Sequence, residues 1–185
     1  MVAGRREDGG LSLSPTDLAR MDLPDRLVLP SPNGSALTVA AQQIDVRHVL
    51  AGCARNASAT AQRAAALSGG RPIAVIAAGE VSDDGSLRPA IEDLLGAGAV
   101  ISARADRMPS PEARVAASTF EATRATLGEL IGDCASAREL TAVGFADDVA
   151  MATDLDVCHV AAELRDGAYV AVEQPRTRSP AQSGR

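Results

Sequence analysis

The sequence has very few aromatic residues. Of its 185 residues only 2% are Phe, Tyr or Trp, and Trp is absent. Proteins that bind single-stranded nucleic acid usually stack bases on aromatic side chains, so the composition argues against that class. Excess positive charge is lacking as well, because 24 acidic residues outnumber 18 basic ones and give a net charge of -6. Such a chain repels polyanions, and we expect no nucleic-acid partner.

Paired cysteines and long apolar runs are also lacking. Cys53, Cys134 and Cys158 are widely spaced, odd in number and outside any Cys-x-x-Cys pattern, and the chain has only two His residues. This pattern argues against a zinc site and predicts free thiols in a reducing cytoplasm. No apolar run approaches the ~20 residues that span a bilayer, and residues 1–10 do not resemble a signal peptide. We therefore expect a cytoplasmic protein with no membrane partner.

The apolar content that is present, 46%, is enough for one core, built mainly from Ala, Val, Leu and Ile. Three segments repeat the order strand, polar loop, helix, and their strands are the short apolar runs 26–30, 46–52 and 72–79. Runs of this kind are typical of parallel strands that helices cover on both faces. We predict an α/β fold with a mostly parallel sheet flanked by helices, in a single domain over residues 1–173.

The later part of the chain has a different pattern. Residues 110–144 predict a helical stretch, with Ser110 as an N-cap and Gly144 as a stop. Another helix is expected to begin near residues 146–148. Residues 159–173 predict a terminal hairpin or edge strand that turns at Asp166-Gly167. Residues 174–185 contain Pro, Arg, Ser and Gly with little apolar content, which predicts a disordered tail.

Chemistry-bearing side chains follow each of the three predicted strands. In a parallel sheet the strand-to-helix loops emerge at one edge, where ligands bind. The first two loops offer hydroxyl, amide and guanidinium groups that suit an anion, and the third offers carboxylates that suit Mg²⁺. The residues are Ser31, Asn33, Gly34 and Ser35, then Arg55, Asn56 and Ser58, then Glu80, Asp83 and Asp84. Together they predict a site for a phosphate group bridged to a metal ion.

Each of these features also has an ordinary structural interpretation. Asn33-Gly34 is commonly only a turn, Arg55 a solvated residue and Asp83-Asp84-Gly85 a surface turn. For Glu80, which directly follows an apolar run, a metal ligand and a helix cap are equally open. No Walker A, GxGxxG or GxSxG motif occurs, so a kinase, a nicotinamide enzyme and an α/β-hydrolase lack their usual sequence support.

Six segments, in the same order and reaching to about Glu173, carry a family resemblance. They are "AGRREDGGLSLSP", "LVLPSPNGSAL", "VLAGCARNASATA", "VIAAGEVSDDGSLRPAIEDLLGAGAVI", "CASARELTAVGFADDVAMATDLDV" and "LRDGAYV". Together they resemble the 2-phosphosulfolactate phosphatase family. The resemblance implies an α/β fold and a Mg²⁺-dependent phosphatase that hydrolyses (R)-2-phospho-3-sulfolactate to 3-sulfolactate and phosphate, a step of coenzyme M biosynthesis.

The family motifs, combined with the three loops, define a candidate site. We expect Glu80 and Asp93 to hold the metal, and Glu80, Asn33 and Asn56 to take part in catalysis. For Asp93, which falls in a predicted helix, the solvent-facing side of that helix is an equally open interpretation. The residues expected to bind the small anionic phosphorylated substrate are Arg6, Asn33, Gly34, Ser35, Arg55 and Asn56.

The resemblance begins after the family's first strand, which carries a motif of the Asp-Val-Leu-Arg-Ala type. It therefore implies an N-terminally truncated member without that strand's Asp and Arg. Two alternatives to the sulfolactate reaction stay open: a phosphatase for another small phosphorylated acid, and a truncated, non-catalytic paralogue that binds an anion. The sequence leaves the oligomeric state open, although an exposed strand edge favours a homo-oligomer.

Overall fold

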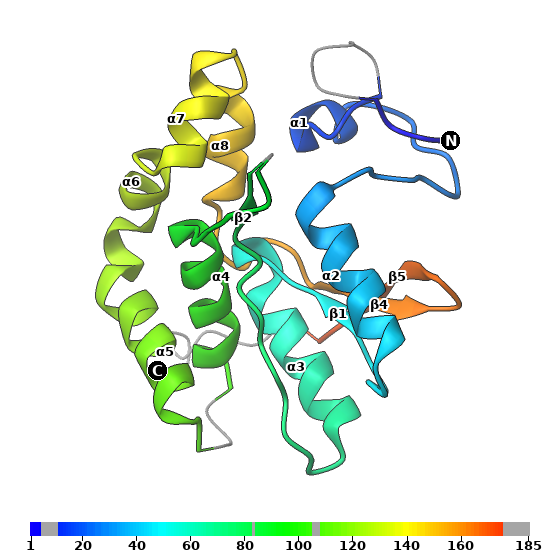
Figure 1. Ribbon diagram of the computed structural model, residues 1–185, viewed down its shortest axis with the longest axis vertical. Coiled ribbons are helices and arrows are strands. Elements are labelled where there is room, and N and C mark those ends of the chain that lie inside the picture. Colours follow the sequence, from blue (N-terminus) through cyan, green and yellow to red (C-terminus); the bar gives the residue numbers. More distant parts are fainter. Residues whose placement is uncertain (5–10, 83, 105–107, 176–185) are drawn as a thin grey trace, which may run out of the picture. The chain divides into compact units, whose positions relative to one another are not determined.

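The computed structural model of the protein describes residues 1–4, 11–82, 84–104 and 108–175 (Figure 1). The chain is α/β, as predicted, and its contacts group it into two compact units. Unit 1 comprises residues 1–47, 77–94 and 123–154, and unit 2 comprises 48–76, 95–122 and 155–185. Each unit is therefore assembled from three segments that are far apart in the sequence.

Unit 1 is mainly helical. Helix α8 contacts α1, α6 and α7, and β2 pairs with β3 as a small antiparallel hairpin. The elements are α1 (Pro15–Leu18), α2 (Pro32–Gln43), β2 (Glu80–Val81), β3 (Leu87–Arg88), the first turn of α4 (Ile91–Ser102), the 3-10 helix η3 (Arg124–Thr126), α6 (Leu127–Gly132), α7 (Ala135–Ala142) and α8 (Ala146–Ala152).

A buried carboxylate ties two helices of unit 1 together. Asp148 on α8 is 3% exposed, and its Oδ1 accepts hydrogen bonds from the Ser14 hydroxyl at 2.7 Å and the Thr16 hydroxyl at 2.6 Å. The backbone N–H of Thr16 donates to the same oxygen at 3.2 Å. These donors surround the start of α1, so Asp148 fixes that short helix to α8.

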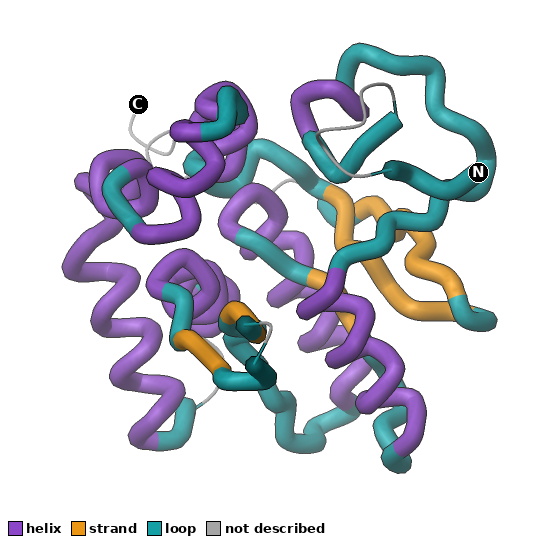
Figure 2. Tube along the Cα trace, turned by 45° about the horizontal axis from the view of Figure 1, so that its top comes forward, coloured by secondary structure: helices purple, strands orange, loops and turns teal. Residues whose placement is uncertain are grey.

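Unit 2 contains a three-stranded antiparallel sheet in the order β1-β4-β5 (Figure 2). The hairpin of β4 and β5 turns at Asp166-Gly167, as predicted, and both turn residues have positive φ, as a tight two-residue turn requires. The elements are β1 (Leu50–Ala51), the 3-10 helix η2 (Ala54–Asn56), α3 (Ala57–Ser68), the rest of α4, α5 (Pro111–Thr123), β4 (Val160–Arg165) and β5 (Ala168–Glu173).

Helix α3 contacts β4, and an ion pair joins the two elements. Oε2 of the buried Glu163 accepts a hydrogen bond from Arg63 Nε at 2.7 Å and lies 2.6 Å from Arg63 Nη2. Arg165 Nη2 donates to the same oxygen at 2.9 Å. The hydrogen bond from Arg165, followed by those from Arg63, holds the pKa of Glu163 below its ordinary value. The carboxylate therefore stays ionised inside unit 2.

The core of unit 2 is built from small side chains, as the composition predicts. A Cβ on Gly98 of α4 would lie 2.4 Å from the Ala116 carbonyl oxygen and 2.8 Å from Phe120 Cβ on α5. Only glycine allows these helices to come so close. Ala61 and Ala161, both fully buried, show the same reliance on small residues elsewhere in the unit.

The mostly parallel sheet that we predicted is not seen in the described parts of the chain. Both sheets are antiparallel, and parallel pairing is limited to the isolated bridges Val2–Val28 and Gly4–Ser12. The run 72–79 is not assigned as a strand, and residues 72–77 are exposed. The reason lies in the strand partners, which a run of apolar residues does not specify. The two residues that follow the third run, Glu80 and Val81, pair with β3 across a short turn, and closing a short loop costs little entropy.

The predicted helix boundaries hold better than the predicted strands. The Ser110 hydroxyl accepts a hydrogen bond from the Ala113 N–H at 3.2 Å, as an N-cap of α5 should. Helix α7 ends at Ala142, and Gly144, the predicted stop, has a φ of 93°, which is typical of the residues that follow a helix. Helix α7 is capped by Cys134, whose Sγ accepts from the Ala137 N–H at 3.4 Å.

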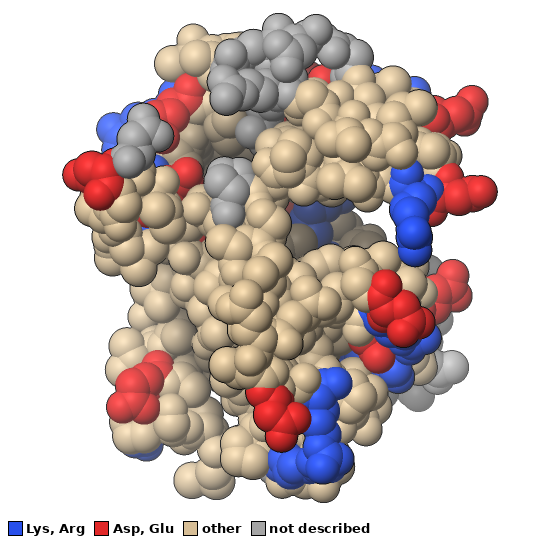
Figure 3. All heavy atoms as spheres, turned by 45° about the vertical axis from the view of Figure 1, so that its right-hand side comes forward, with Lys and Arg blue, Asp and Glu red and all other residues tan. Residues whose placement is uncertain are grey.

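All three cysteines are free in the structure. None of the described helices is long and apolar enough to cross a membrane. On the face drawn in Figure 3, acidic and basic side chains lie beside one another in small groups around uncharged surface. Most of the predicted tail, residues 176–185, lies outside the described residues.

Candidate functional site

The third predicted loop is a β-hairpin. Glu80 begins β2, and the register places it opposite Arg88 of β3. Directly opposed residues of an antiparallel pair have Cβ atoms ~5 Å apart on the same face of the sheet. The acidic residue that the sequence singles out therefore has a cation beside it. We did not predict Arg88, although the Asp-Gly pair between two short apolar runs is a hairpin signal that could have found it.

The guanidinium of Arg88 also reaches α7. Its Nη2 donates to the Ser136 hydroxyl at 3.3 Å and lies 3.6 Å from Glu139 Oε2. The Glu139 side chain is largely exposed, and an ion pair of this kind adds little stability. Arg88 can therefore exchange that partner for an anionic ligand at small cost.

Asp93 lies in the first turn of α4 and points toward the polypeptide. Its Oδ2 accepts a hydrogen bond from the Gly79 N–H at 2.7 Å. Burial raises the pKa of Asp93, the Gly79 hydrogen bond opposes that rise, and the charges of Glu92 and Glu80 add to it. The interpretation of Asp93 as a solvent-facing helix residue is therefore wrong. Its carboxylate is close enough to Glu80 for the negative charge of Glu80 to raise its pKa.

Asn33 belongs to a helix and not to a turn, because α2 begins at Pro32. Its Oδ1 accepts a hydrogen bond from the Val81 N–H at 3.3 Å. Ser35 donates its N–H to the Ser31 carbonyl oxygen at 3.1 Å, and its hydroxyl donates to the same oxygen. A Cβ on Gly34 would meet Ser31 Oγ at 3.4 Å, an ordinary contact, so the fold does not require glycine there.

Three predicted site residues thus gather around one short segment of unit 1. The N–H groups of Gly79 and Val81 donate to Asp93 and Asn33, and Glu80 stands between them. Gly79 has a φ of 71°, and a Cβ there would lie 2.8 Å from Leu87 Cδ1 and 3.1 Å from the Arg88 carbonyl oxygen. Because Gly79 has no Cβ, its backbone can lie against β3 and at the same time donate its N–H to Asp93 in the first turn of α4.

The loop that follows β1 in unit 2 is organised differently. Asn56 is 9% exposed, its Oδ1 accepts from the Cys53 N–H at 2.9 Å, and its Nδ2 donates to the Val160 carbonyl oxygen at 3.1 Å. The carbonyl oxygen of Arg55 accepts from the Cys158 N–H at 2.8 Å. In the structure, the amide of Asn56 thus links the end of β1 to the start of β4.

The first turn of α3 carries an internal anion. Asp156 Oδ1 accepts a hydrogen bond from the Ser58 N–H at 2.7 Å, and its Oδ2 accepts from the Ser58 hydroxyl at 2.7 Å. We had expected Ser58 to help bind the substrate anion. Within unit 2, a carboxylate of the protein itself takes that place.

Two of the predicted residues, Arg6 and Asp83, lie outside the described residues. Asp84 is exposed and accepts a hydrogen bond from the Ser86 N–H at 2.9 Å. Hydrogen bonds from Ser86 lower the pKa of Asp84. Asp84 and Gly85 therefore lie in an exposed turn, in agreement with the interpretation of this segment as a surface turn.

The donor set in unit 1 consists of oxygen atoms. Within the described ranges no group of three or more His, Cys, Asp or Glu residues is placed to hold a metal ion. Mg²⁺ commonly uses only one or two protein carboxylates and completes its shell with water and substrate phosphate. The carboxylates of Glu80 and Asp93 fit that requirement.

The comparisons with known proteins give one positive finding. A family model described as 2-phosphosulpholactate phosphatase matches residues 4–167, nearly the whole chain. The comparison with curated proteins gives no match. The matched range includes the β2–β3 hairpin and the first turn of α4, where Glu80, Arg88 and Asp93 lie. The chain belongs to the 2-phosphosulpholactate phosphatase family and, as a member, is a phosphoric monoester hydrolase.

Proposed function

We propose that the protein is a Mg²⁺-dependent phosphatase for small 2-phosphorylated acids, with 2-phospho-3-sulfolactate of the coenzyme M pathway as the first substrate to test. The observation that carries the proposal is the placement of Glu80, Asp93 and Asn33 around Gly79 and Val81, with Arg88 opposite Glu80. Carboxylates and a cation side by side suit a phosphate that must be both neutralised and oriented.

In this proposal Glu80 and Asp93 would hold Mg²⁺. The bound ion would neutralise the phosphoryl oxygens and lower the pKa of an attacking water. Arg88 pairs with a substrate oxyanion, and the Asn33 amide donates to a phosphate oxygen. Arg55 and Arg6 stay predictions as further anion ligands, as do the roles of Gly34 and Ser35 in substrate binding. For Asn56, whose amide is bonded to backbone at both ends, we propose a structural role in place of the predicted role in catalysis and substrate binding.

The reaction is a direct hydrolysis. The oxygen of a water molecule attacks phosphorus, and the bond between phosphorus and the oxygen on C2 of the acid breaks. That oxygen leaves with the electron pair and takes a proton. The products are the 2-hydroxy acid and inorganic phosphate, so no oxidant or second substrate is needed.

The test is phosphate release from 2-phospho-3-sulfolactate by the whole chain, with EDTA and after Mg²⁺ is restored. We expect activity that EDTA abolishes and Mg²⁺ returns. Glu80→Gln should lower kcat about a hundredfold or more, because one neutralising metal ligand is lost. The control, Glu129→Gln, changes an exposed carboxylate on α6 and should leave kcat within about twofold. Equal activity of both variants would contradict the proposal.

A further inference from the structure

Two side chains of helix α7 contact Arg88 of the β2–β3 hairpin. The Nη2 of Arg88 donates to the Ser136 hydroxyl at 3.3 Å and lies 3.6 Å from Glu139 Oε2. Ser136 and Glu139 are three positions apart, so they lie on the same face of α7. The hairpin and α7 both belong to unit 1. One face of α7 therefore meets the cation that the proposed function assigns to the substrate.

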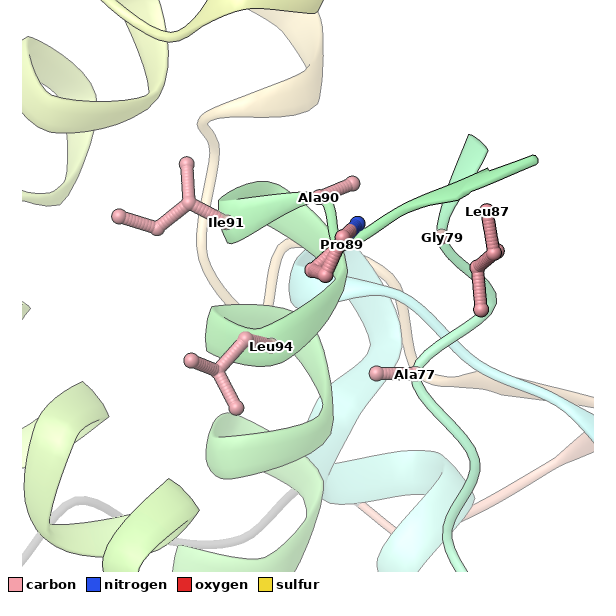
Figure 4. A pocket seen from close by; sticks show the side chains of 7 residues that line it. All are labelled: Ala77, Gly79, Leu87, Pro89, Ala90, Ile91 and Leu94. Atoms are coloured by element: carbon pink, nitrogen blue, oxygen red, sulfur yellow. The ribbon is translucent and has the colours of Figure 1, made fainter. Parts of the chain in front are cut away.

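The β2–β3 hairpin has two chemically different faces. Leu87 lines an apolar pocket of about 350 Å³, together with the residues that lead into and form the first turn of α4 (Figure 4). Successive side chains of a strand point to opposite faces, so Arg88 lies on the face away from Leu87, where it is paired with Glu80. The contact with α7 is consequently made on the charged face of the hairpin.

The ion pair between Arg88 and Glu139 is exposed and easily broken. The side chain of Glu139 is 70% exposed and that of Arg88 35%. A pair of this kind is weakened by water and salt and adds little stability. Ser136, by contrast, lies in the first turn of a helix that packs on α6 and α8. Glu139 can therefore leave Arg88 while the hydrogen bond to Ser136 keeps the guanidinium beside α7.

We infer that Glu139 competes with the phosphate group for Arg88 and so limits how tightly the site holds substrate and product, an inference that rests on the proposed function. A guanidinium binds a phosphate through parallel N–H donors, and a phosphate bound in this way to Arg88 lies near the Glu139 carboxylate. The two anions repel each other, so Glu139 must turn toward solvent when phosphate binds. Its return to Arg88 favours the release of phosphate after hydrolysis.

The experiment measures two quantities on the whole chain with Mg²⁺: the Kd of inorganic phosphate, by calorimetry, and kcat/KM for 2-phospho-3-sulfolactate. Glu139→Gln removes the competing charge at nearly constant size, so the Kd should fall and kcat/KM should rise, each about threefold. Glu139→Lys places a second cation beside Arg88 and should lower the Kd about tenfold below the wild-type value. A residue with a merely structural role would not give this graded change in phosphate affinity.

Glu129 supplies the matched controls. It is an exposed carboxylate on α6 of the same unit, so Glu129→Gln and Glu129→Lys change the net charge of the chain by the same amounts. Both control variants should leave the Kd of phosphate within about 1.5-fold of wild type, because salt screens a charge that is not at the site. Thermal unfolding of all the variants checks that each is folded.

A double variant tests whether the effect of Glu139 depends on Arg88. Arg88→Gln alone should weaken phosphate binding about tenfold or more, because a charged hydrogen-bond donor to the anion is lost. When Glu139→Gln is added to Arg88→Gln, the Kd should change by less than about 1.5-fold, since no cation remains for which Glu139 and phosphate compete.

The outcomes separate the two proposals. If Glu139→Gln leaves the Kd of phosphate at the wild-type value, or if its effect persists in the Arg88→Gln background, the inference is overturned. Turnover by the wild-type chain would in both cases leave the phosphatase proposal intact. Phosphate release from neither 2-phospho-3-sulfolactate nor 2-phospholactate would overturn the proposed function and, with it, the inference.

Discussion

Asn33 of unit 1 and Asn56 of unit 2 look alike in sequence, since each closely follows an apolar run, yet they have different surroundings. Both ends of the Asn56 amide are bonded to backbone, and the residue is buried. The Oδ1 of Asn33 accepts a hydrogen bond from the exposed Val81 N–H, directly after Glu80 in the chain. A polar side chain after an apolar run can therefore either satisfy backbone hydrogen-bonding groups or bind a ligand. The hydrogen bonds that the side chain makes in the structure distinguish the two roles.

The starts of the helices that follow differ in the same way. In α3, Asp156 accepts two hydrogen bonds from Ser58. Helix α2 has no acidic residue in its first turn, and its N-cap Ser31 makes no side-chain capping bond within the described parts of unit 1. Unit 2 thus uses the anion affinity of a helix start for its own stability.

Replacing each asparagine by alanine should give the largest difference between the two units, measured as the change in the free energy of unfolding. Asn56→Ala should lower the free energy of unfolding by about 2–3 kcal/mol, because the buried amide is lost and the partly buried Cys53 N–H and Val160 carbonyl oxygen are left without their partner. Asn33→Ala removes one half-exposed hydrogen bond and should cost below about 0.5 kcal/mol. Urea unfolding of both variants measures the difference.

The effects on activity should run the other way. Asn33→Ala should lower kcat/KM about tenfold or more, because a donor to the phosphate is lost. Folded Asn56→Ala, assayed well below its unfolding temperature, should keep KM within about twofold of the wild-type value. A large rise in KM for Asn56→Ala at unchanged stability would assign Asn56 to the substrate and contradict the comparison.

Glu163 offers a smaller test that depends on pH. Its pKa is lowered in the folded chain by Arg165 and Arg63, so its charge stabilises unit 2 above the unfolded pKa of Glu. That stability is lost as pH falls through the lower, folded pKa. Glu163→Gln should therefore cost about 2 kcal/mol at neutral pH, and the difference from wild type should shrink in acid.

The measurement is urea unfolding of wild type and Glu163→Gln across the acid range. Glu173→Gln, at the exposed end of β5, is the control and should be nearly neutral at every pH. A Glu163→Gln effect that stays constant down to the most acid pH would mean that charge is not its origin. The pair with Arg63 would then act through packing alone.

Local signals in the sequence predicted local structure well. Ser110, Gly144 and Asp166-Gly167 mark helix ends and a turn, because each acts through its own backbone or that of near neighbours. Strand partners are set by contacts far along the chain, so the apolar runs predicted strands without identifying their neighbours. The pairing of β1 with β4 joins residues more than a hundred positions apart.

The candidate site shows the same limit. The carboxylates of Glu80 and Asp93 could be identified from their motif, but the roles of their neighbours depended on boundaries. Pro32 at the first position of α2 is a helix-start signal, and with it Asn33 is helical and not part of a turn. Arg88 becomes a neighbour of Glu80 only once the segment between them is recognised as a hairpin.

The smallest effect that we predict concerns Asp156, which accepts two hydrogen bonds from Ser58 in the first turn of α3. Asp156 has a φ of 53°, a left-handed conformation that costs ordinary residues about 1 kcal/mol and glycine almost nothing. Asp156→Ala loses the bonds to Ser58 and keeps the strain, whereas Asp156→Gly loses the same bonds and relieves it. The free energy of unfolding should therefore be about 1 kcal/mol higher for Asp156→Gly than for Asp156→Ala. Equal stability of the two variants would show that residue 156 leaves the left-handed region once its carboxylate is gone, and hence that the bonds to Ser58 impose the strained backbone.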